Sequence, residues 1–488
     1  MDKNLTALKP ALVWKHFAEI AKIPRPSSHE EKIRAYVIGV AKSLGLECKE
    51  DAAHNVYVRK PASKGMENRK GIVLQAHLDM VPQKNHDKKF DFTKDPIEAY
   101  IDGEWVTANG TTLGADNGIG AAAILAVLED DTLEHGPLEA LFTATEETGM
   151  DGAFGLKKGV LHGDILLNLD SEDEGELFIG CAGGIDSVAE FTYKEVDVPA
   201  GYFCCKVQVK GLKGGHSGGD IHLGLGNANK LLNRFLSQTF KKYDMYLCEI
   251  DGGNLRNVIA REAHAVIAIP EADKHALRTD LNVFAAQAEA EYAVTDPDLQ
   301  FTLESENPRA KAIDKDTSKR LLQALYAAPH GVYAMSQDIP GLVETSTNLA
   351  SVKMKPGNII RIETSQRSSI ESSKQDIATM VRTVFEMAGA SVSFGDGYPG
   401  WKPNPHSEIL EIAAESYKRL FGVDAKIKAI HAGLECGLFL DKYPSLDMIS
   451  FGPTLQGVHS PDERMLIPTV QKFWDHLLDI LKHIPAKN

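Results

Sequence analysis

The sequence predicts an α/β protein of two domains, with a second α/β domain inserted into the first. Short apolar runs typical of strands buried on both faces alternate with helical segments early in the chain and again near its end. Between residues 187 and 399 the strands carry more charge and the helices are amphipathic. The first domain is therefore predicted to comprise residues 1–186 and 400–488, with a mixed, largely parallel sheet flanked by helices. Residues 187–399 form the insertion.

In the first domain the elements follow from hydrophobic periodicity. Ser28-His-Glu-Glu31 has the form of a capping box, and apolar residues at helical spacing continue to Gly45, which predicts a helix. Strands and helices then alternate, so the strands should lie parallel with helices on both faces of the sheet. The predicted elements are strands at 71–76, 138–145 and 164–169, with helices at 118–128 and 151–157 between them.

The inserted domain alternates charged strands with amphipathic helices, and no internal repeat is visible in it. A stretch rich in glycine, Gly395–Gly400, closes the insertion, and the chain then returns to the first sheet. The predicted elements are strands at 204–210 and 263–269, helices at 227–239 and 274–290, and, after the insertion, helices at 408–420, 434–441 and 470–483 beside an apolar run at 446–451.

Composition excludes several classes of partner. Of 488 residues, Asp and Glu outnumber Lys and Arg by 68 to 53, and no basic run could follow a phosphate backbone, so nucleic acid is not expected. The longest apolar stretch, Gly118–Leu128, is shorter than the ~20 residues that span a bilayer. No secretory signal is visible, and the six cysteines form no Cys-x-x-Cys pair, which predicts a cytoplasmic protein with reduced thiols.

Charged side chains follow the predicted buried strands at the points where the strands end. They are His77 and Asp79 after the first run, Glu146 and Glu147 after the second, Asp170 after the third, and Asp116 before a helix. Ligands of open α/β sheets bind beyond the carboxyl ends of the strands, so these residues should converge. Five carboxylates close together repel one another unless cations neutralise them. The sequence therefore predicts a divalent metal site, with a pair of ions as the simplest arrangement.

Local spacing gives these residues different directions. His77 and Asp79 point to the same side of an extended chain, whereas Glu146 and Glu147 point to opposite sides, so one can bind metal while the other moves protons. His459 follows a late apolar run that returns to the same sheet. Imidazole and carboxylate ligands without thiolates suit Zn²⁺, Mn²⁺ or Co²⁺. Two such ions together can activate a water molecule and polarise a carbonyl group.

The motifs resemble those of the co-catalytic metallopeptidases that include aminoacylase, carboxypeptidase G and carnosinase. The matching motifs are His77-Leu-Asp79, Gly114-Ala-Asp-Asn-Gly118, Thr145-Glu-Glu147, Leu169-Asp-Ser171 and Gly433-Leu-Glu435. The resemblance covers essentially the whole chain. It implies a two-domain enzyme that hydrolyses unblocked dipeptides, with a C-terminal histidine preferred, using two divalent metal ions, with zinc favoured over manganese or cobalt.

The resemblance also implies a role for each residue of the cluster. One metal ion would be held by His77 and Asp170, the other by Glu147 and His459, and Asp116 would bridge the two; Glu146 would be the general base, and Asp79 would orient His77. In the inserted domain, which would act as a lid, His216 would stabilise the oxyanion and Arg367 would hold the substrate carboxylate. Asn257 and Gly433 would contact the substrate, and the lid would form a homodimer.

Three alternatives remain. Gly215-His-Ser-Gly-Gly219 satisfies the Gly-x-Ser-x-Gly pattern of serine hydrolases, with Ser217 as the nucleophile, although further glycines follow where that motif requires a helix. An N-acyl amino acid deacylase would use the same metal site as a dipeptidase. A metal-dependent binding protein without turnover is a third alternative, against which the retention of Glu146 argues.

Overall fold

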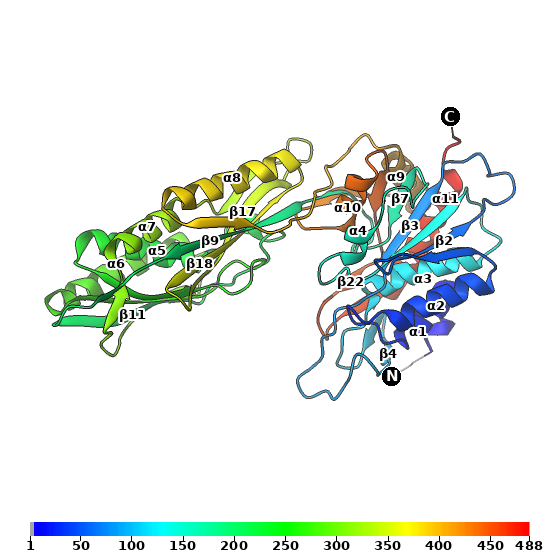
Figure 1. The fold of residues 1–488 in the computed structure, drawn as a ribbon. Coiled ribbons are helices and arrows are strands. Elements are labelled where there is room, and N and C mark those ends of the chain that lie inside the picture. The colour runs from blue at the N-terminus through cyan, green and yellow to red at the C-terminus, as the bar shows by residue number, and fades with distance from the viewer. Residues whose placement is uncertain (1–3, 488) are drawn as a thin grey trace. The chain divides into compact units, whose positions relative to one another are not determined.

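The structure, a computed structural model, describes residues 4–487 and divides into two compact units (Figure 1). The first unit contains the chain up to Gly180, Trp401–Ala429, and the chain from Leu434 onward. The second contains Cys181–Gly400 and Ile430–Gly433. The boundary that the sequence places after residue 186 falls inside strand β9 (Gly183–Thr192), all of which lies in the second unit.

The main sheet of the first unit has eight strands. Their order is β1 (Glu47–Glu50), β2 (Val56–Lys60), β6 (Leu138–Thr143), β3 (Ile72–His77), β7 (Ile165–Asn168), β21 (Asp447–Ser450), β8 (Glu176–Cys181) and β20 (Lys426–Ile430). The four central strands, β6, β3, β7 and β21, are parallel, and β1, β2 and β8 pair antiparallel. Every residue of β3, β6 and β7 is buried, as expected for parallel strands covered on both faces. These three predicted strands are confirmed.

Helices cover this sheet (Figure 1). Helix α3 packs against β3 and against α1, while α9 packs against β21 and against α11. Almost all of α3 is buried because its Ala-rich sequence lets it approach closely on all sides. The helices of the unit are η1 (Leu5–Ala7), α1 (Ala11–Ala21), α2 (Glu31–Ser43), α3 (Ala115–Glu129), α4 (Asp151–Gly155), α9 (Glu408–Phe421), α10 (Glu435–Lys442) and α11 (Ile467–His483). A smaller sheet has the order β22 (Leu455–Gln456), β23 (Arg464–Leu466), β5 (Trp105–Ala108) and β4 (Ala99–Asp102).

The predicted capping box at the start of α2 is wrong, although the helix itself is confirmed. Glu30 occupies the N-cap position, and its side chain makes no capping hydrogen bond. Its carboxylate instead accepts hydrogen bonds from the backbone N–H of Ser28, at 3.0 Å, and from Thr145, a residue far along the chain. The carboxylate at this position therefore stabilises a distant turn rather than the helix end.

The second unit is built on a nine-stranded sheet in which all the described strand pairs are antiparallel. Eight of its strands follow the order β14 (Gln300–Ser305), β11 (Tyr202–Lys210), β13 (Ala263–Pro270), β12 (Tyr246–Gly252), β17 (Val343–Lys355), β18 (Ile359–Ser368), β9 and β19 (Ser391–Phe394), and β16 (Gly331–Met335) pairs with β17. Helices α5 (Ala228–Lys242), α6 (Lys274–Glu291), α7 (Lys315–Ala327) and α8 (Glu371–Met387) and the short turns η2 (Ile221–Leu223) and η3 (Glu271–Asp273) complete it.

This sheet contains the same topology twice. One βαββαβ motif is formed by β11-α5-β12-β13-α6-β14, and another by β9-α7-β17-β18-α8-β19. In both motifs the strands lie across the sheet in the order fourth, first, third, second. The two motifs join edge to edge where β12 pairs with β17. The first motif is inserted into the second, and its entry and exit strands, β10 (Glu195–Asp197) and β15 (Lys311–Ile313), pair with each other. The sequence does not reveal this structural repeat.

Candidate metal centre

The predicted cluster assembles at one edge of the main sheet of the first unit. Its residues are His77 at the end of β3, Glu146 and Glu147 in the turn after β6, Asp170 two residues beyond β7, Asp116 in the non-helical first turn of α3, and His459 between β22 and β23. Since β3, β6 and β7 are parallel neighbours, their carboxyl ends meet. The residues are thus brought together by topology.

Two imidazoles reach one carboxylate from opposite sides. His77 Nε2 lies 3.0 Å from Asp116 Oδ1 and 3.4 Å from Asp170 Oδ1. His459 Nε2 lies 3.2 Å from Asp116 Oδ2 and 3.0 Å from Glu147 Oε2. In each of these two sets of three residues the potential ligand atoms lie within 4.8 Å of one another. Asp116 belongs to both sets, so the grouping is the one that the resemblance implies; metal ligation by these residues stays a prediction.

The cluster carries an excess of negative charge. Burial raises the pKa of Asp170 to about 6. Hydrogen bonds to Asp116 and Glu147 raise the pKa of His459 to about 11. Burial acts to raise the pKa of Asp116 as well, but its hydrogen bonds with the two imidazoles outweigh burial and hold it well below its usual range. The ionised carboxylates therefore depend on positive charge placed directly between them.

The donor set fits divalent ions. Glu147 Oε1 is buried and has no hydrogen-bond partner among the described residues. Its other oxygen faces His459, so a buried carboxylate is left with one unsatisfied lone-pair direction inside the cluster. All the atoms that converge are carboxylate oxygens or imidazole nitrogens, the ligands that Zn²⁺, Mn²⁺ and Co²⁺ accept. The residues present can therefore hold such ions.

Asp79 lies behind His77, fully buried. Its Oδ1 atom is 3.3 Å from His77 Nδ1 and accepts the backbone N–H of Glu146 at 2.9 Å. Its Oδ2 atom accepts the N–H of Glu147 at 3.1 Å and the hydroxyl of Ser27 at 2.8 Å. One carboxylate thus lies against the imidazole of His77 and holds the turn that carries the two glutamates.

Glu146 lies in the same cluster as its neighbour. Atoms of His77, Glu146 and Glu147 lie within 4.8 Å of one another. Burial raises the pKa of Glu146 well above its usual range. A carboxylate with a raised pKa is a better proton acceptor than a solvated one, which agrees with the predicted role of Glu146 as general base; that role stays a prediction.

Two buried glutamates near the cluster were not assigned a role from the sequence. Glu30 Oε1 accepts hydrogen bonds from the backbone N–H and the hydroxyl of Thr145, at 3.0 and 2.8 Å. Glu435 Oε2 accepts hydrogen bonds from Gln75 Nε2 at 2.6 Å and Thr143 Oγ1 at 2.8 Å, and burial raises the pKa of Glu435 to about 8. No local pattern signals the contact of Glu30, because its partner lies 115 residues away.

The residues predicted to contact the substrate also cluster, and Gly433, which the predicted boundaries assign to the first domain, lies with the others in the second unit. The backbone N–H of Ser217, next to His216, donates to the carbonyl of Asn257 at 2.8 Å, and Arg367 Nε lies 3.4 Å from Ser217 Oγ. Arg367 Nη1 donates to the hydroxyl of Tyr398 at 2.8 Å. The ring of Tyr398 lies so close to Gly433 that a Cβ added there would be 2.8 Å from it. Tyr398 was not predicted from the sequence, yet it joins Arg367 to Gly433.

His216 is half-buried with a defined tautomer. Its Nδ1 atom accepts hydrogen bonds from the backbone N–H groups of Gly218 and Gly219, at 3.3 and 3.0 Å. The proton of the neutral ring must therefore be on Nε2. Burial, followed by the charge of Arg367, lowers the pKa of His216, so the neutral ring dominates at pH 7. The side chain thus presents one N–H donor.

Ser217 does not have the surroundings of a hydrolase nucleophile. Its hydroxyl is buried and lies near the guanidinium of Arg367, while the ring nitrogen of the adjacent His216 is bonded to glycine N–H groups. Only the three-residue turn η2 (Ile221–Leu223) follows it closely. A nucleophile elbow needs a base at the hydroxyl and a helix directly after the serine, so the geometry does not favour a serine hydrolase.

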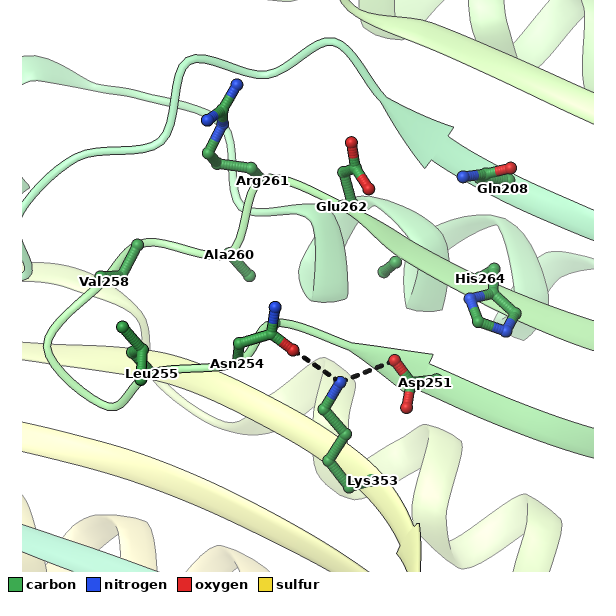
Figure 2. Close-up of a pocket in the computed structure, with 12 residues that line it drawn as sticks. Gln208, Asp251, Asn254, Leu255, Val258, Ala260, Arg261, Glu262, His264 and Lys353 are labelled. Carbon is green, nitrogen blue, oxygen red and sulfur yellow. Dashed lines mark hydrogen bonds and ion pairs between the residues drawn. The ribbon is translucent and has the colours of Figure 1, made fainter. Parts of the chain in front are cut away.

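A pocket of 510 Å³ lies elsewhere in the second unit, beside the loop that carries Asn257 (Figure 2). Lys353 crosses it and bonds to Asp251 at 2.7 Å and to Asn254 Oδ1 at 3.0 Å. Its walls carry both acidic and basic side chains, and none of the four residues predicted to contact substrate lines it. The pocket borders the cluster around Arg367 through Val258, which lines it and forms a β-bridge with His216.

The α/β fold with an inserted second unit and the carboxylate–imidazole cluster are those expected of a metallopeptidase. Residues 73–483 match peptidase family M20/M25/M40, and the chain belongs to that family. Among residues 4–487, no helix has the length and apolar character needed to cross a membrane.

Comparison with known proteins identifies close relatives. The chain is 50% identical over 487 residues to the cytosol non-specific dipeptidase of Escherichia coli (strain K12), covering 99% of this chain and 100% of the relative. It is similar to the crystal structure of aminoacylhistidine dipeptidase from Vibrio alginolyticus, with 47% identity, 99% of each chain covered and a TM-score of 0.92. A tripeptidase from Staphylococcus aureus shares the fold at 16% identity, with a TM-score of 0.56 over 98% of this chain and 99% of that one.

Proposed function

We propose that this protein is a dipeptidase that hydrolyses unblocked dipeptides, with Xaa-His dipeptides preferred, at a two-metal centre in its first unit. The observation that carries the proposal is the pair of potential ligand sets that share Asp116. Support comes from the two close relatives, one named as a non-specific dipeptidase and the other as an aminoacylhistidine dipeptidase. The resemblance in sequence motifs favours a C-terminal histidine.

Five residues are proposed to hold two divalent ions, Zn²⁺ in preference to Mn²⁺ or Co²⁺. They are His77 and Asp170 for one ion, Glu147 and His459 for the other, and Asp116 between them. When bound, the ions would supply Lewis acidity toward the scissile carbonyl and lower the pKa of a water molecule. Every other step would be carried out by side chains of the protein.

Glu146 is proposed to move the proton. It would accept a proton from the attacking water and deliver it to the leaving amine, two transfers that suit a buried carboxylate with a raised pKa. Asp79 holds the backbone N–H groups of Glu146 and Glu147 and would keep the base in place during both transfers. The same carboxylate would fix the tautomer of His77.

The second unit is proposed to contact two parts of the substrate, its C-terminal carboxylate and the oxygen on which the oxyanion develops. Arg367, buried and held by Tyr398, would pair with the substrate carboxylate, and this would restrict the enzyme to short substrates with a free C-terminus. His216 would donate its Nε2–H to the developing oxyanion. Asn257, which is exposed, and Gly433 would contact the bound dipeptide.

Two further features belong to the proposal. Residence in the cytoplasm is supported by the name of the Escherichia coli relative, a cytosol dipeptidase. A homodimer through the second unit rests on the family resemblance alone. Sedimentation velocity of the full chain measures it directly, and a single species at the monomer mass would contradict it.

A substrate panel tests the function. Full-length protein would be assayed on Xaa-His dipeptides, other dipeptides, tripeptides, amidated dipeptides and N-acyl amino acids, before and after treatment with a chelator and after addition of Zn²⁺, Mn²⁺ or Co²⁺. We expect hydrolysis of dipeptides only, loss on chelation, and recovery with metal. Cleavage of N-acyl amino acids in preference to dipeptides would establish a deacylase. Full activity in metal-free protein, with loss on fluorophosphonate labelling, would establish a serine hydrolase.

A further inference from the structure

Two buried charged residues of the first unit, Arg25 and Glu463, contact backbone rather than opposite charges. Each is 2% exposed. Within residues 4–487, neither lies within ion-pair distance of an opposite charge, and Asp79 and Glu463 act on Arg25 only at longer range. A buried charge without a counter-charge is costly unless hydrogen bonds satisfy it. Their hydrogen-bond partners therefore indicate what each residue is for.

Glu463 receives four backbone N–H groups in succession. Its Oε2 atom accepts from Leu113 at 2.7 Å and Gly114 at 2.9 Å, and its Oε1 atom accepts from Ala115 at 2.8 Å and Asp116 at 3.3 Å. Only a carboxylate can accept at both oxygens, because an amide would turn an NH₂ group toward two of the donors. The loop that ends in Asp116 is thus held by one ionised side chain.

Arg25 holds the same loop from its other side. Its Nη1 atom donates to the carbonyls of Leu78 at 2.8 Å and Asp79 at 2.7 Å, and its Nη2 atom donates to the carbonyl of Gly114. Gly114 is therefore bonded through its N–H to Glu463 and through its carbonyl to Arg25. At its φ of +70°, an added Cβ would lie 2.7 Å from Arg25 Nη2, so only glycine fits between the two residues.

These contacts connect the three segments that carry His77, Asp116 and His459. Arg25 joins the loop after His77 to the loop before Asp116. Glu463 lies four residues after His459 and joins that segment to Asp116. Asp116 faces His77 with one oxygen and His459 with the other, so a small displacement of its backbone would disturb both ligand sets.

We propose that Arg25 and Glu463 are positioning residues that fix the spacing of His77, Asp116 and His459 and so set the affinity of the centre for divalent ions. The inference rests on the proposed metal centre and deepens it. Residues that orient metal ligands from behind change metal affinity roughly 10- to 100-fold when they are replaced. A residue with only a structural role would lower stability without that change.

The test measures the dissociation constant for Zn²⁺ by competition with a chelating indicator, on full-length Glu463→Gln and Arg25→Lys variants. Glu139→Gln is the matched control, since Glu139 is a buried carboxylate of the same unit that accepts the backbone N–H groups of His162 and Gly163 at 2.7 and 3.0 Å. We expect the dissociation constant to rise at least 10-fold in both variants and to stay within twofold of wild type in the control.

The outcomes separate this inference from the proposed function. Wild-type Zn²⁺ affinity in folded Glu463→Gln and Arg25→Lys proteins, with dipeptide hydrolysis by the wild type intact, would overturn the positioning role alone. A rise of the same size in Glu139→Gln would also overturn it. If the wild type binds no Zn²⁺, both the metal centre and this inference fail. Should Glu463→Gln not fold, Arg25→Lys, which keeps the charge and loses the forked geometry, decides the question.

Discussion

The two units assemble their polar residues in opposite ways. In the first unit, parallel strands bring several carboxylates to one edge, where two imidazoles face them and two buried oxygens, Glu147 Oε1 and Asp170 Oδ1, have no hydrogen-bond partner among the described residues. In the second unit, the residues around Arg367 form a chain of hydrogen bonds from Asn257 through Ser217 and Arg367 to Tyr398. The first cluster carries an excess of negative charge, whereas in the second the buried guanidinium of Arg367 is bonded to hydroxyl groups and, among the described residues, pairs with no carboxylate.

The difference follows from topology. Neighbouring parallel strands end at the same edge of the sheet, so the side chains that follow each strand gather at that edge. The antiparallel sheet of the second unit has no such edge, and the residues around Arg367 come from loops and from strand β18. This contrast supports the proposed division, with ion binding and proton transfer in the first unit and substrate recognition in the second. The following predictions test that division.

The largest effect is expected from the proton carrier in the first unit. Glu146→Gln should lower kcat by ~10³-fold or more, because the amide keeps the shape of the side chain but cannot accept a proton. Metal content, measured by elemental analysis of the purified variant, should remain that of the wild type. Glu147→Gln, one residue further, should instead reduce metal content. Near-normal kcat in Glu146→Gln with metal bound would show that the base lies elsewhere.

In the second unit, His216→Ala should lower kcat by roughly 10²- to 10³-fold, as for loss of one donor to an oxyanion. Metal content should not change, since His216 is in neither ligand set. His222→Ala is the control, because His222 is an exposed histidine six residues away on the same segment. Steady-state kinetics on one Xaa-His substrate decide the matter, and equal kcat values for the two variants would remove His216 from the mechanism.

Arg367→Ala should act on substrate binding. We expect kcat/KM to fall roughly 30- to 1000-fold, equivalent to about 2–4 kcal/mol of lost charged pairing, mainly through KM. Arg361→Ala provides the control on the same strand, where Arg361 is 39% exposed and pairs with Glu363 at 3.0 Å. Amidation of the substrate should cost the wild type about as much as the Arg367 substitution does. Equal rates on a dipeptide and its amide would contradict this role.

The elements that could be predicted from the sequence are those whose signal is local. The buried runs that became β3, β6 and β7 and the amphipathic helices α5 and α9 each carry their own periodicity, and each is found where it was expected. The ends of the parallel strands then placed His77, Glu147 and Asp170 together, because topology needs only the order of strands.

The features that could not be predicted depend on long-range contacts. Glu463 lies 350 residues from Leu113, and backbone N–H groups leave no mark in the sequence. The stretch Ser28–Glu31 was predicted to form a capping box, but the N-cap residue is Glu30, whose carboxylate is bonded to Thr145 instead. The repeated βαββαβ topology is invisible because strand pairing constrains burial patterns rather than residue identity, so two copies need not share a sequence.

The smallest effect concerns the core of the first unit. His476 on α11 is 3% exposed, packs against the rings of Tyr417 and Phe451, and donates its Nε2–H to the carbonyl of Ala413 at 2.8 Å. Burial lowers the pKa of His476 to about 4. Because the unfolded chain binds this proton at a pKa near 6.5, the stabilising contribution is complete above pH 6.5 and is lost as the pH falls toward 4. At pH 5 the loss should be about 2 kcal/mol.

Unfolding in urea, followed by tryptophan fluorescence in the presence of a chelator, measures this loss in the first unit alone. All four tryptophans, Trp14, Trp105, Trp401 and Trp474, lie in that unit. Between pH 7.5 and pH 5, the free energy of unfolding should fall by about 2 kcal/mol more in the wild type than in His476→Gln, whose amide can still donate to Ala413 but does not titrate. Burial likewise lowers the pKa of His330, in the second unit, to about 4, so acid should weaken both units whereas chelation should weaken only the first. Equal pH dependence in the wild type and His476→Gln would show that the buried ring does not control the acid sensitivity of this core.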